Sequence, residues 1–308
     1  MVIAVFDLGT NVFNLLIARV SKDGCNILKV IQRGSHIGQG GFRKGYLTDE
    51  AIESSLEAMD NLTEILKEEG GATIVKAFAT SAIRDSSNGE EFVLMLRDRY
   101  NIDVEIISGE REAELIYKGV RESLLLYNEK VLVLDIGGGS NEFIIADKDK
   151  IYWKQSYPLG VIRMKEIINP SDPITEDEIE RYHNYLDDSL GDLVKEASVH
   201  KPKLLVGSSG SFDTLRELIF PGDKGDLPAM ELPIGSFHEL HRRLLCSTRE
   251  ERTKMAGMSP MRVDYMVLGS IFAEYVIKKL GITELYQSSY SLKEGYMSEV
   301  ALSMTNYK

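Results

Sequence analysis

The sequence contains little cysteine and no long apolar run. Of its 308 residues only Cys25 and Cys246 are cysteines, and they stand far apart, outside any paired spacing. This scarcity argues against a disulfide framework or a cysteine zinc site, and we expect both thiols to be reduced and buried. No apolar stretch approaches the roughly 20 residues that span a bilayer, and the N-terminus MVIAVFDLGT lacks the basic region and cleavage site of a signal peptide. The sequence therefore predicts a cytoplasmic protein with no membrane partner.

Positive charge is also scarce. The 36 Lys and Arg residues are outnumbered by 48 Asp and Glu residues, which gives a formal net charge of −12. Nonspecific affinity for nucleic acid comes largely from clustered Lys and Arg, so we expect no nucleic-acid partner. A polyanionic substrate is still compatible with this charge, provided that backbone amides, a metal ion and a few cations hold it locally. The length and the 43% share of hydrophobic residues are typical of a globular protein with about two domains.

Residues 133–142, VLDIGGGSNE, combine an apolar run, a carboxylate and three consecutive glycines. A strand can deliver Asp135 to its carboxyl end, while Gly137, Gly138 and Gly139 let the chain turn tightly and leave their N–H groups uncovered. Bare amides can approach phosphate oxygens closely, and a neighbouring carboxylate can hold the divalent cation that accompanies phosphate. The alternative is a glycine-rich hairpin turn with a capping Asp.

The N-terminus repeats this arrangement. The stretch VIAVFDLGTNVFNLLIARV again runs from a strand-like segment through Asp-aliphatic-Gly and a short polar turn into a second apolar run. Asp7 precedes Asp135 by 128 residues, and at the same offset Gly9 matches Gly137 without a gap. Two such hairpins at one offset predict a duplicated domain whose halves face each other, and they weaken the interpretation as an incidental turn.

The remaining segments alternate between strand-like and helix-like patterns, as an α/β architecture requires. Strands are expected at 13–20, 25–31, 74–79, 104–107, 130–135, 142–146 and 151–156, and from 203 up to the turn GSSGS. Helices are expected after Thr48, after Asn88 with Glu91, at 109–125, near Asp213, and behind the capping boxes Thr175 with Glu178 and Ser236 with Glu239. We place the domain boundary after residue 126, which gives domains 1–126 and 127–308.

Seven motifs, in this order, carry a resemblance to a known family: DLGTN, ATSAIRDSSN, IISGEREAELIYKGV, LDIGGGSNE, YPLGVIRM, LLVGSSGS and SLKEG. From about residue 2 to about residue 297 the chain is similar to the exopolyphosphatase and guanosine pentaphosphate phosphatase family, which belongs with actin, sugar kinases and heat-shock chaperone ATPases. The resemblance implies an α/β fold of two duplicated ribonuclease-H-like (actin-like ATPase) domains with an interdomain phosphate-binding cleft. Thr10, Val12, Asn141 and Lys293 depart from the residues usual in the family, and Val12 offers no polar contact to phosphate.

Hydrolysis of a phosphoanhydride needs a cradle for negative oxygens, a cation and a group that activates water. Glu112 matches the catalytic glutamate of the resembled family; the alternative is an acid that merely favours a helix N-terminus. Asp7, Asp135 and Glu142 are expected around Mg²⁺ or another divalent cation, with Asp7 and Asp135 as ligands and with Asp135 and Glu142 assisting Glu112 in catalysis. The expected phosphate-binding residues are Gly9, Thr10, Asn11, Arg84, Gly137, Gly138, Gly139, Ser140, Gly207, Ser208, Ser209 and Gly210.

Some of these residues have a purely structural alternative. Arg84 could form a salt bridge with the neighbouring acidic residues instead of binding phosphate. The turn at 207–210 could serve only to connect a strand to a helix. His238 and His241 lie one helical turn apart but lack a third ligand, so they fit a solvated helix face better than a metal site.

The resemblance implies an exopolyphosphatase that releases terminal orthophosphate from inorganic polyphosphate, with guanosine pentaphosphate as a further substrate. Longer relatives carry extra C-terminal domains, whereas the match here leaves about eleven residues after Met297, so we expect distributive cleavage of short chains. A homodimer is the commonest assembly of a soluble enzyme. Two other classes stay open: a small-metabolite kinase, whose use of ATP would require an acceptor, and a noncatalytic actin-like nucleotide-binding module, in which changing Glu112 would have no effect.

Overall fold

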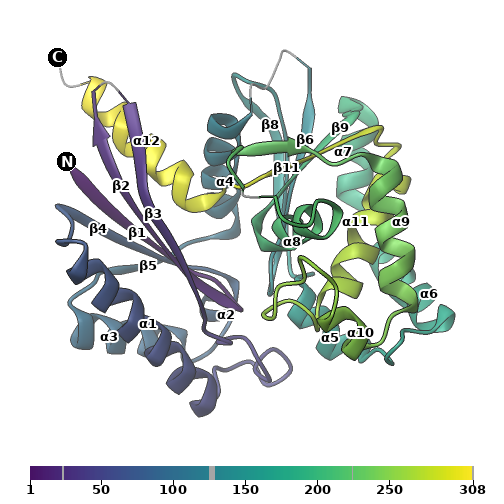
Figure 1. Cartoon of the computed structure of the whole chain (residues 1–308), viewed down its shortest axis with the longest axis horizontal. Helices are drawn as coiled ribbons and strands as arrows, with labels where there is room; N and C mark the ends of the chain where they lie inside the picture. Colours follow the sequence, from purple (N-terminus) through teal and green to yellow (C-terminus); the bar gives the residue numbers. More distant parts are fainter. Residues whose placement is uncertain (23, 125–128, 224, 307–308) are drawn as a thin grey trace.

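Two mixed β-sheets, each flanked by helices, make up the protein (Figure 1). The computed structural model describes residues 1–22, 24–124, 129–223 and 225–306. The first sheet has the strand order β3-β2-β1-β4-β5. Its strands are β1 (Val2–Leu8), β2 (Val12–Ser21), β3 (Gly24–Gly34), β4 (Ile74–Ala79) and β5 (Val104–Ile106). The helices of this first lobe are α1 (Asp49–Glu68), α2 (Ser81–Arg84), α3 (Gly89–Tyr100) and α4 (Gly109–Ser123).

The second sheet has the order β10-β11-β9-β6-β7-β8. Its strands are β6 (Val131–Ile136), β7 (Asn141–Ala146), β8 (Ile151–Tyr157), β9 (Leu204–Ser208), β10 (Ala229–Glu231) and β11 (Glu284–Ser288). The helices of this second lobe are α5 (Val161–Ile168), α6 (Glu176–Ser189), α7 (Gly191–His200), α8 (Ser209–Ile219), α9 (Ile234–Cys246), α10 (Arg249–Thr253) and α11 (Met266–Leu280). The chain then continues into α12 (Leu292–Asn306).

Both sheets are built in the same order. Each contains an antiparallel hairpin, β1–β2 or β6–β7, and each places two later strands parallel to the first strand of that hairpin. These are β4 and β5 in the first lobe and β9 and β11 in the second. Parallel strands need crossover connections, which the helices supply. The repeat of 128 residues is therefore a repeat of structure, and the predicted α/β fold of two duplicated domains is confirmed.

Helices α4 and α12 pack against each other between the two sheets. One apolar cluster draws on both sheets and includes Val5 and Val133. Gly119 of α4 and Gly295 of α12 let the backbones touch, because a Cβ atom on them would lie 2.0 and 1.9 Å from a carbonyl oxygen of the facing segment. Although it is last in the chain, α12 lies beside β1 and β2 (Figure 1). The predicted boundary after residue 126 lies outside the described residues and stays a prediction.

Two predicted helix starts are confirmed by their caps. Thr48 accepts a hydrogen bond from the first turn of α1, and Thr175 forms a capping box with Glu178 at the start of α6. Asn88 does precede α3, but its side chain exchanges hydrogen bonds with the backbone of Leu47 and does not cap the helix. A tertiary contact to a neighbouring loop has replaced the local one.

The predicted capping box of Ser236 with Glu239 is wrong. Helix α9 has Pro233 at its N-cap, so Ser236 already lies inside the first turn. Proline pre-sets the backbone angle and lacks the N–H that would need a partner there, which explains the earlier start. Helix α8 also begins earlier than predicted, at Ser209, directly after the strand that precedes it. The start near Asp213 is therefore corrected by one helical turn.

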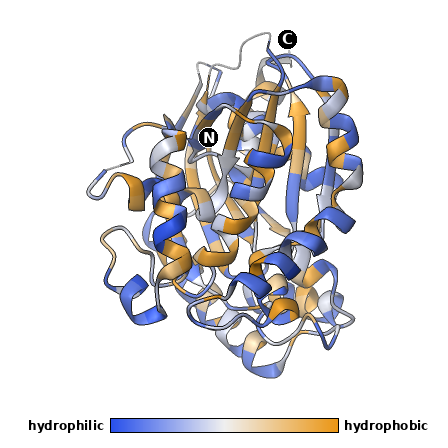
Figure 2. Ribbon diagram, turned by 90° about the vertical axis from the view of Figure 1, so that its right-hand side faces the viewer, coloured by the Kyte–Doolittle hydropathy of each residue, from blue (hydrophilic) through white to orange (hydrophobic). Residues whose placement is uncertain are grey.

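The two cysteines are free, but both are exposed, so the prediction of buried thiols is wrong. Cys25 lies on the edge strand β3, and Cys246 is the last residue of α9. Figure 2 shows apolar residues concentrated on the strands, while the outer helices carry both polar and apolar residues. Within the described ranges no helix is both long and apolar enough to cross a bilayer. The cytoplasmic location and the homodimer stay predictions.

Candidate functional site

Each glycine hairpin closes in the same way. A Cβ atom on Gly9 would lie 2.8 Å from the carbonyl oxygen of Val12, and a Cβ atom on Gly137 would lie 2.6 Å from that of Ser140. The two pairs are separated by the 128-residue offset of the sequence repeat. A side chain at either position would collide with the backbone that leaves the turn, so glycine is required at both.

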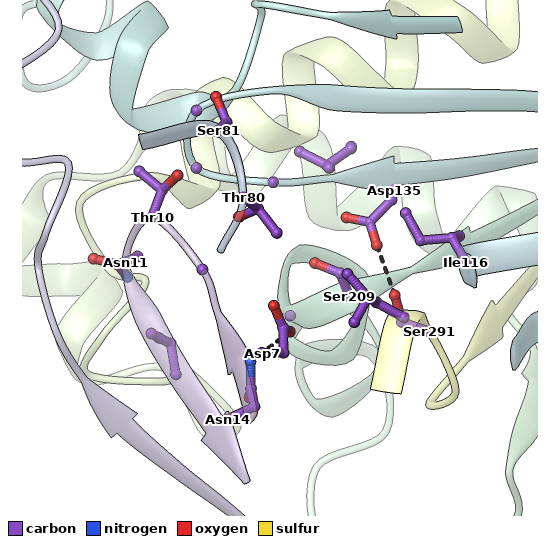
Figure 3. Close-up of a pocket in the computed structure, with 18 of the residues that line it drawn as sticks. Asp7, Thr10, Asn11, Asn14, Thr80, Ser81, Ile116, Asp135, Ser209 and Ser291 are labelled. Carbon is purple, nitrogen blue, oxygen red and sulfur yellow. Dashed lines mark hydrogen bonds between the residues drawn. The ribbon is translucent and has the colours of Figure 1, made fainter. Parts of the chain in front are cut away.

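The two turns also touch each other across the space between the lobes (Figure 3). A Cβ atom on Gly138 would lie 2.9 Å from Thr10 Cβ, and one on Gly139 would lie 2.9 Å from Thr10 Oγ1 and 2.6 Å from Ser81 Oγ. Gly137, Gly138 and Gly139 do not adopt positive φ angles. The predicted tight turn therefore explains Gly137, whose Cβ would meet the backbone of its own hairpin, whereas the missing side chains of Gly138 and Gly139 permit the close approach of the two lobes.

The N–H groups of Gly138 and Gly139 are unpaired among the described residues, and both glycines line the cleft between the lobes. The carbonyl oxygen of Gly138 accepts hydrogen bonds from the first turn of α5, from Ile162 N at 2.9 Å and Arg163 N at 3.2 Å. The N–H of Gly139 belongs to the same trans peptide, so it points the opposite way, away from α5. Neither glycine N–H donates to another of the described residues. Unpaired amides of this kind suit phosphate oxygens.

A pocket with an empty volume of about 790 Å³ lies between the hairpins. Twelve predicted site residues line it: Asp7, Gly9, Thr10, Asn11, Glu112, Asp135, Gly137, Gly138, Gly139, Ser140, Ser209 and Gly210. Four predicted residues do not: Arg84, Glu142, Gly207 and Ser208. A Cβ atom on Gly207 would lie 2.1 Å from the Phe212 ring, so this glycine makes room for the core. Ser208 donates a hydrogen bond to Asp135 Oδ2 at 3.1 Å.

Two carboxylates stand near the carboxyl ends of β1 and β6 in the pocket (Figure 3). Asp7 Oδ2 accepts a hydrogen bond from Asn14 Nδ2 at 3.0 Å, and Asp135 Oδ2 accepts one from Ser291 Oγ at 2.9 Å. Burial raises the pKa of Asp7 to about 6, although Lys293 opposes this, and burial also raises the pKa of Asp135. Asn14 faces Asp7 in the hairpin register, a position that the sequence pattern could have indicated.

Glu112 lies on the first turns of α4, and its carboxylate is buried. Its Oε2 accepts a hydrogen bond from Arg84 Nη1 at 2.9 Å, and the same Nη1 donates to Ile107 O at 3.0 Å. Arg84 Nε also lies 3.5 Å from Asp85, so its guanidinium forms the salt bridges that were the alternative to a phosphate contact. Burial raises the pKa of Glu112 to about 7 in spite of Arg84. A phosphate contact by Arg84 stays a prediction.

Glu142 is almost completely buried beside Asp135. It pairs with Asp135 across the antiparallel ladder, and its Oε1 accepts a hydrogen bond from Ser156 Oγ at 2.7 Å. Burial raises the pKa of Glu142 well above its usual value, and the charges of Glu112 and Asp135 raise it further. Because Glu142 does not line the pocket, its predicted place around a cation stays a prediction.

Three charged residues complete the pocket: Asp213, Arg262 and Lys293. Of these, only Lys293 belongs to a sequence motif. Burial raises the pKa of Asp213 to about 6, against the opposing charges of Arg262 and Lys293. Arg262 comes from the segment before α11, and its guanidinium covers Gly210, where a Cβ atom would lie 1.5 Å from Nη2. Its sequence context, GMSPMRVD, contains no phosphate-binding pattern, so only the fold reveals it.

Asp7 and Asp135 could together hold a divalent cation. Asp135 is buried and Asp7 is half-buried, both have a raised pKa, and each offers only oxygen ligands. In the part of the chain that the structure describes, no group of three or more His, Cys, Asp or Glu side chains could hold a metal ion. A cation here would take its other ligands from water and from the oxygens of a bound molecule, which is the usual coordination of Mg²⁺ at phosphate sites. The donor set therefore fits Mg²⁺.

The chain is similar to known phosphatases over nearly its whole length. The sequence profile of the Ppx/GppA phosphatase family matches residues 16–304. Exopolyphosphatase 2 of Mycobacterium tuberculosis is 30% identical, and the alignment covers 98% of each protein. An exopolyphosphatase structure from Cytophaga hutchinsonii has a TM-score of 0.95 and 37% identity over 98% of both chains. The PPX-GPPA enzyme of Aquifex aeolicus has a TM-score of 0.80 and 26% identity over 97% of this chain and 99% of its own. This protein therefore belongs to the Ppx/GppA phosphatase family.

Proposed function

We propose that this protein is an exopolyphosphatase, which releases terminal orthophosphate from inorganic polyphosphate by metal-assisted hydrolysis. The observation that carries the proposal is the convergence of unpaired glycine amides, two aspartates and Glu112 on one pocket. Amides bind phosphate oxygens, carboxylates hold a cation, and a buried glutamate with a pKa near neutrality can take a proton from water. Two relatives that match nearly the whole chain carry the name exopolyphosphatase.

The terminal phosphoryl group would bind between the two hairpin turns. The N–H groups of Gly138 and Gly139 and the hydroxyl of Thr10 supply hydrogen-bond donors from both lobes. Arg262 and Lys293, which line the same pocket, offset the charge of the phosphates that follow. Donors already in place when the charge develops are the main source of stabilisation in phosphoryl transfer.

Glu112 is the proposed general base. Its Oε2 is held by Arg84, whereas its Oε1 accepts no hydrogen bond from the described residues and is available to a water molecule. Glu112 would take one proton of that water as the oxygen attacks the terminal phosphorus atom. The bond to the bridging oxygen then breaks, and the shortened chain leaves as an anion. Arg84 orients the carboxylate through this cycle.

Asp7 and Asp135 would hold Mg²⁺ or another divalent cation beside the phosphoryl group. Bound there, the cation offsets negative charge on the phosphate oxygens. The raised pKa of each aspartate reflects the desolvation of its negative charge, which the charge of Lys293 offsets only in part. A bound cation would remove that imbalance and would lower both pKa values.

The proposed base makes a prediction for the pH dependence. Glu112 acts only when ionised, and burial raises its pKa to about 7. We expect kcat/KM to level off above about pH 7.5 and to fall about tenfold per pH unit on the acid side, because kcat/KM reports the groups of the free enzyme. Phosphate release from tripolyphosphate at low substrate concentration, measured between pH 5 and pH 9, tests this. An acid limb centred near the ordinary glutamate value of about 4.3 would contradict the assignment.

The pocket favours short chains. Among the described residues that line it, Arg262 and Lys293 are the cationic ones, and the net charge of −12 repels a long polyanion. We therefore expect distributive cleavage, with guanosine pentaphosphate accepted more weakly. A digest of long polyphosphate, stopped at partial conversion and separated on a gel, should give a ladder of shortening intermediates. Full-length chains beside free phosphate alone would indicate processive cleavage and contradict the prediction.

One comparison tests the proposed function as a whole. Phosphate release should be measured in parallel, with Mg²⁺, from long polyphosphate, tripolyphosphate and guanosine pentaphosphate. The proposal expects release from tripolyphosphate without any acceptor. In the same assay with ATP, consumption of ATP only after a metabolite is added would instead identify a kinase. If none of these substrates were turned over, the protein would be a noncatalytic nucleotide-binding module.

A further inference from the structure

Helix α5 carries two charged side chains that contact the opposite lobe. Arg163 and Glu166 lie three residues apart, so they share one face of the helix. The same helix binds the second glycine turn through its backbone, since Ile162 N and Arg163 N donate to Gly138 O. Helix α5 therefore connects the second phosphate-binding turn to the first lobe.

Arg163 makes contacts with both lobes. Its Nε donates to Gly139 O at 2.9 Å within the second lobe. Its Nη2 donates to Ser81 Oγ at 3.3 Å and to Asp85 Oδ2, and its guanidinium lies 4.2 Å from the centre of the Phe42 ring, all in the first lobe. The side chain is only 17% exposed, so these interactions are partly shielded from water. One guanidinium thus joins a pocket-lining glycine to three residues of the first lobe, which belong to two segments.

Glu166 binds a loop of the first lobe. Its two carboxylate oxygens accept hydrogen bonds from Gly40 N at 2.9 Å and Arg43 N at 3.3 Å. The loop in turn holds the first glycine turn, because Gly38 N donates to Thr10 O at 3.0 Å. Glu166 is therefore connected to Thr10, which faces Gly138 and Gly139 in the pocket.

The contacts of Arg163 also continue to the proposed base. Asp85, which pairs with Arg163, lies 3.5 Å from Arg84 Nε, and Arg84 donates to Glu112. The partners of Arg163 therefore stand on both sides of the phosphate site, at Gly139 and, through Asp85 and Arg84, at Glu112. Charge-assisted hydrogen bonds of this kind are stronger than neutral ones and demand a defined geometry.

We propose that Arg163 and Glu166 are positioning residues that form an interdomain clasp, which holds the two glycine turns at the separation that binds phosphate. The effects of this clasp on KM and kcat rest on the proposed function, the hydrolysis of polyphosphate. Without the clasp the lobes would separate in part of the population, and only the closed fraction would bind substrate with both turns. The apparent affinity is then the affinity of the closed form multiplied by the closed fraction. At saturation the substrate itself keeps the enzyme closed.

The kinetic test compares Arg163→Met and Glu166→Gln with the wild-type enzyme. Each loses charge-assisted contacts, and we expect KM for tripolyphosphate to rise about tenfold or more, with kcat changed by less than about twofold. Arg163→Lys keeps the charge beside Asp85 and should recover part of the loss. Lys165→Met is the matched control: Lys165 lies on the same helix, but its partners Asp264 and Tyr265 belong to its own lobe, so its KM should not change.

A distance measurement tests the clasp independently of activity. The two cysteines of the chain are exposed and lie one on each lobe, Cys25 on β3 and Cys246 on α9. Spin labels on these native cysteines would report the separation of the lobes by double electron–electron resonance, so no cysteine has to be introduced. We expect one main distance in the wild type and a second, longer distance in Arg163→Met. Tripolyphosphate should restore the wild-type distance when Glu112→Gln is added to prevent hydrolysis.

The outcomes separate the clasp from the proposed function. If wild-type enzyme releases no phosphate, the function fails, while the labels still test the clasp. Identical distances in the wild type and in both Arg163→Met and Glu166→Gln would overturn the clasp. So would a longer distance with an unchanged KM, or a fall in kcat without a rise in KM. Because the two substitutions break different contacts, a folding failure of one leaves the other to decide.

Discussion

Replacement of Glu112 by Gln is expected to reduce turnover by about a hundredfold or more while substrate still binds, since positioned general bases contribute about this much. The amide keeps the shape of the carboxylate, and its oxygen can still accept the hydrogen bond from Arg84 that is 2.9 Å long in the wild type. It cannot take a proton from water. Phosphate release from saturating tripolyphosphate with Mg²⁺ measures the first effect, and calorimetric titration of the same variant measures the second.

The control for this substitution lies on the same helix. Glu110 is two residues earlier, its side chain is 58% exposed, and its Oε2 lies 3.3 Å from Lys154. Glu110→Gln removes the same charge from a surface contact, so we expect kcat within about twofold of the wild type. If Glu112→Gln kept more than about a tenth of the wild-type rate, the assignment of Glu112 as the base would be refuted.

Replacement of Gly139 by Val should weaken phosphate binding without unfolding the protein. The nearest atoms to a new Cβ are Ser81 Oγ at 2.6 Å, Phe42 Cζ at 2.8 Å and Thr10 Oγ1 at 2.9 Å, and all three belong to the first lobe. The added side chain therefore pushes the lobes apart and leaves the core of the second lobe intact. Since overpacking costs about 1–3 kcal/mol, we expect the dissociation constant to rise roughly 5- to 150-fold.

The measurement uses calorimetric titration with tripolyphosphate in the Glu112→Gln background, in which the ligand is not consumed. Gly191→Val is the matched control, because a Cβ at Gly191 would have no heavy atom within 4 Å and the site is far along the chain from either turn. Urea denaturation should show similar free energies of unfolding for both variants. An unchanged dissociation constant for Gly139→Val would mean that the close approach of the turns does not matter for binding.

Most strands could be predicted because apolar residues follow a short-range pattern. The segment from Ile74 to Ala79 is β4 as expected, and the two glycine hairpins occur at the predicted offset. Helix starts were predicted less accurately than strands, because a side chain that could cap a helix can bind another partner instead. Asn88 shows this, because its amide bonds to Leu47, 41 residues away in the chain. Whether Asn88 caps the helix or binds the loop depends on where that loop packs, and a pattern of neighbouring residues carries no information on this.

The site could be predicted in part for a related reason. Asp7, Asp135 and Glu112 stand in motifs, and the structure brings them to one pocket. Arg262 and Asp213 had no motif. They reach the pocket because α8 bonds to the end of β6 through Ser211, and because the segment before α11 bonds to Asn11 of the first turn. Arg84 had a motif, but its guanidinium turns to Glu112 and Asp85. A sequence motif indicates the helix, strand or turn on which a residue lies, whereas the packing of the elements decides which partner its side chain contacts.

The sequence by itself determined the duplication, the position of each acid-glycine hairpin and the acidic character of the chain. These properties depend on residue order and on spacings of a few residues, or on an exact repeat of 128. Only the tertiary structure decided that Gly138 and Gly139 serve the approach of the two lobes and that α5 reaches across the cleft with Arg163 and Glu166. Those facts depend on how separate elements pack, where contacts between residues about 80 to 130 positions apart decide the geometry.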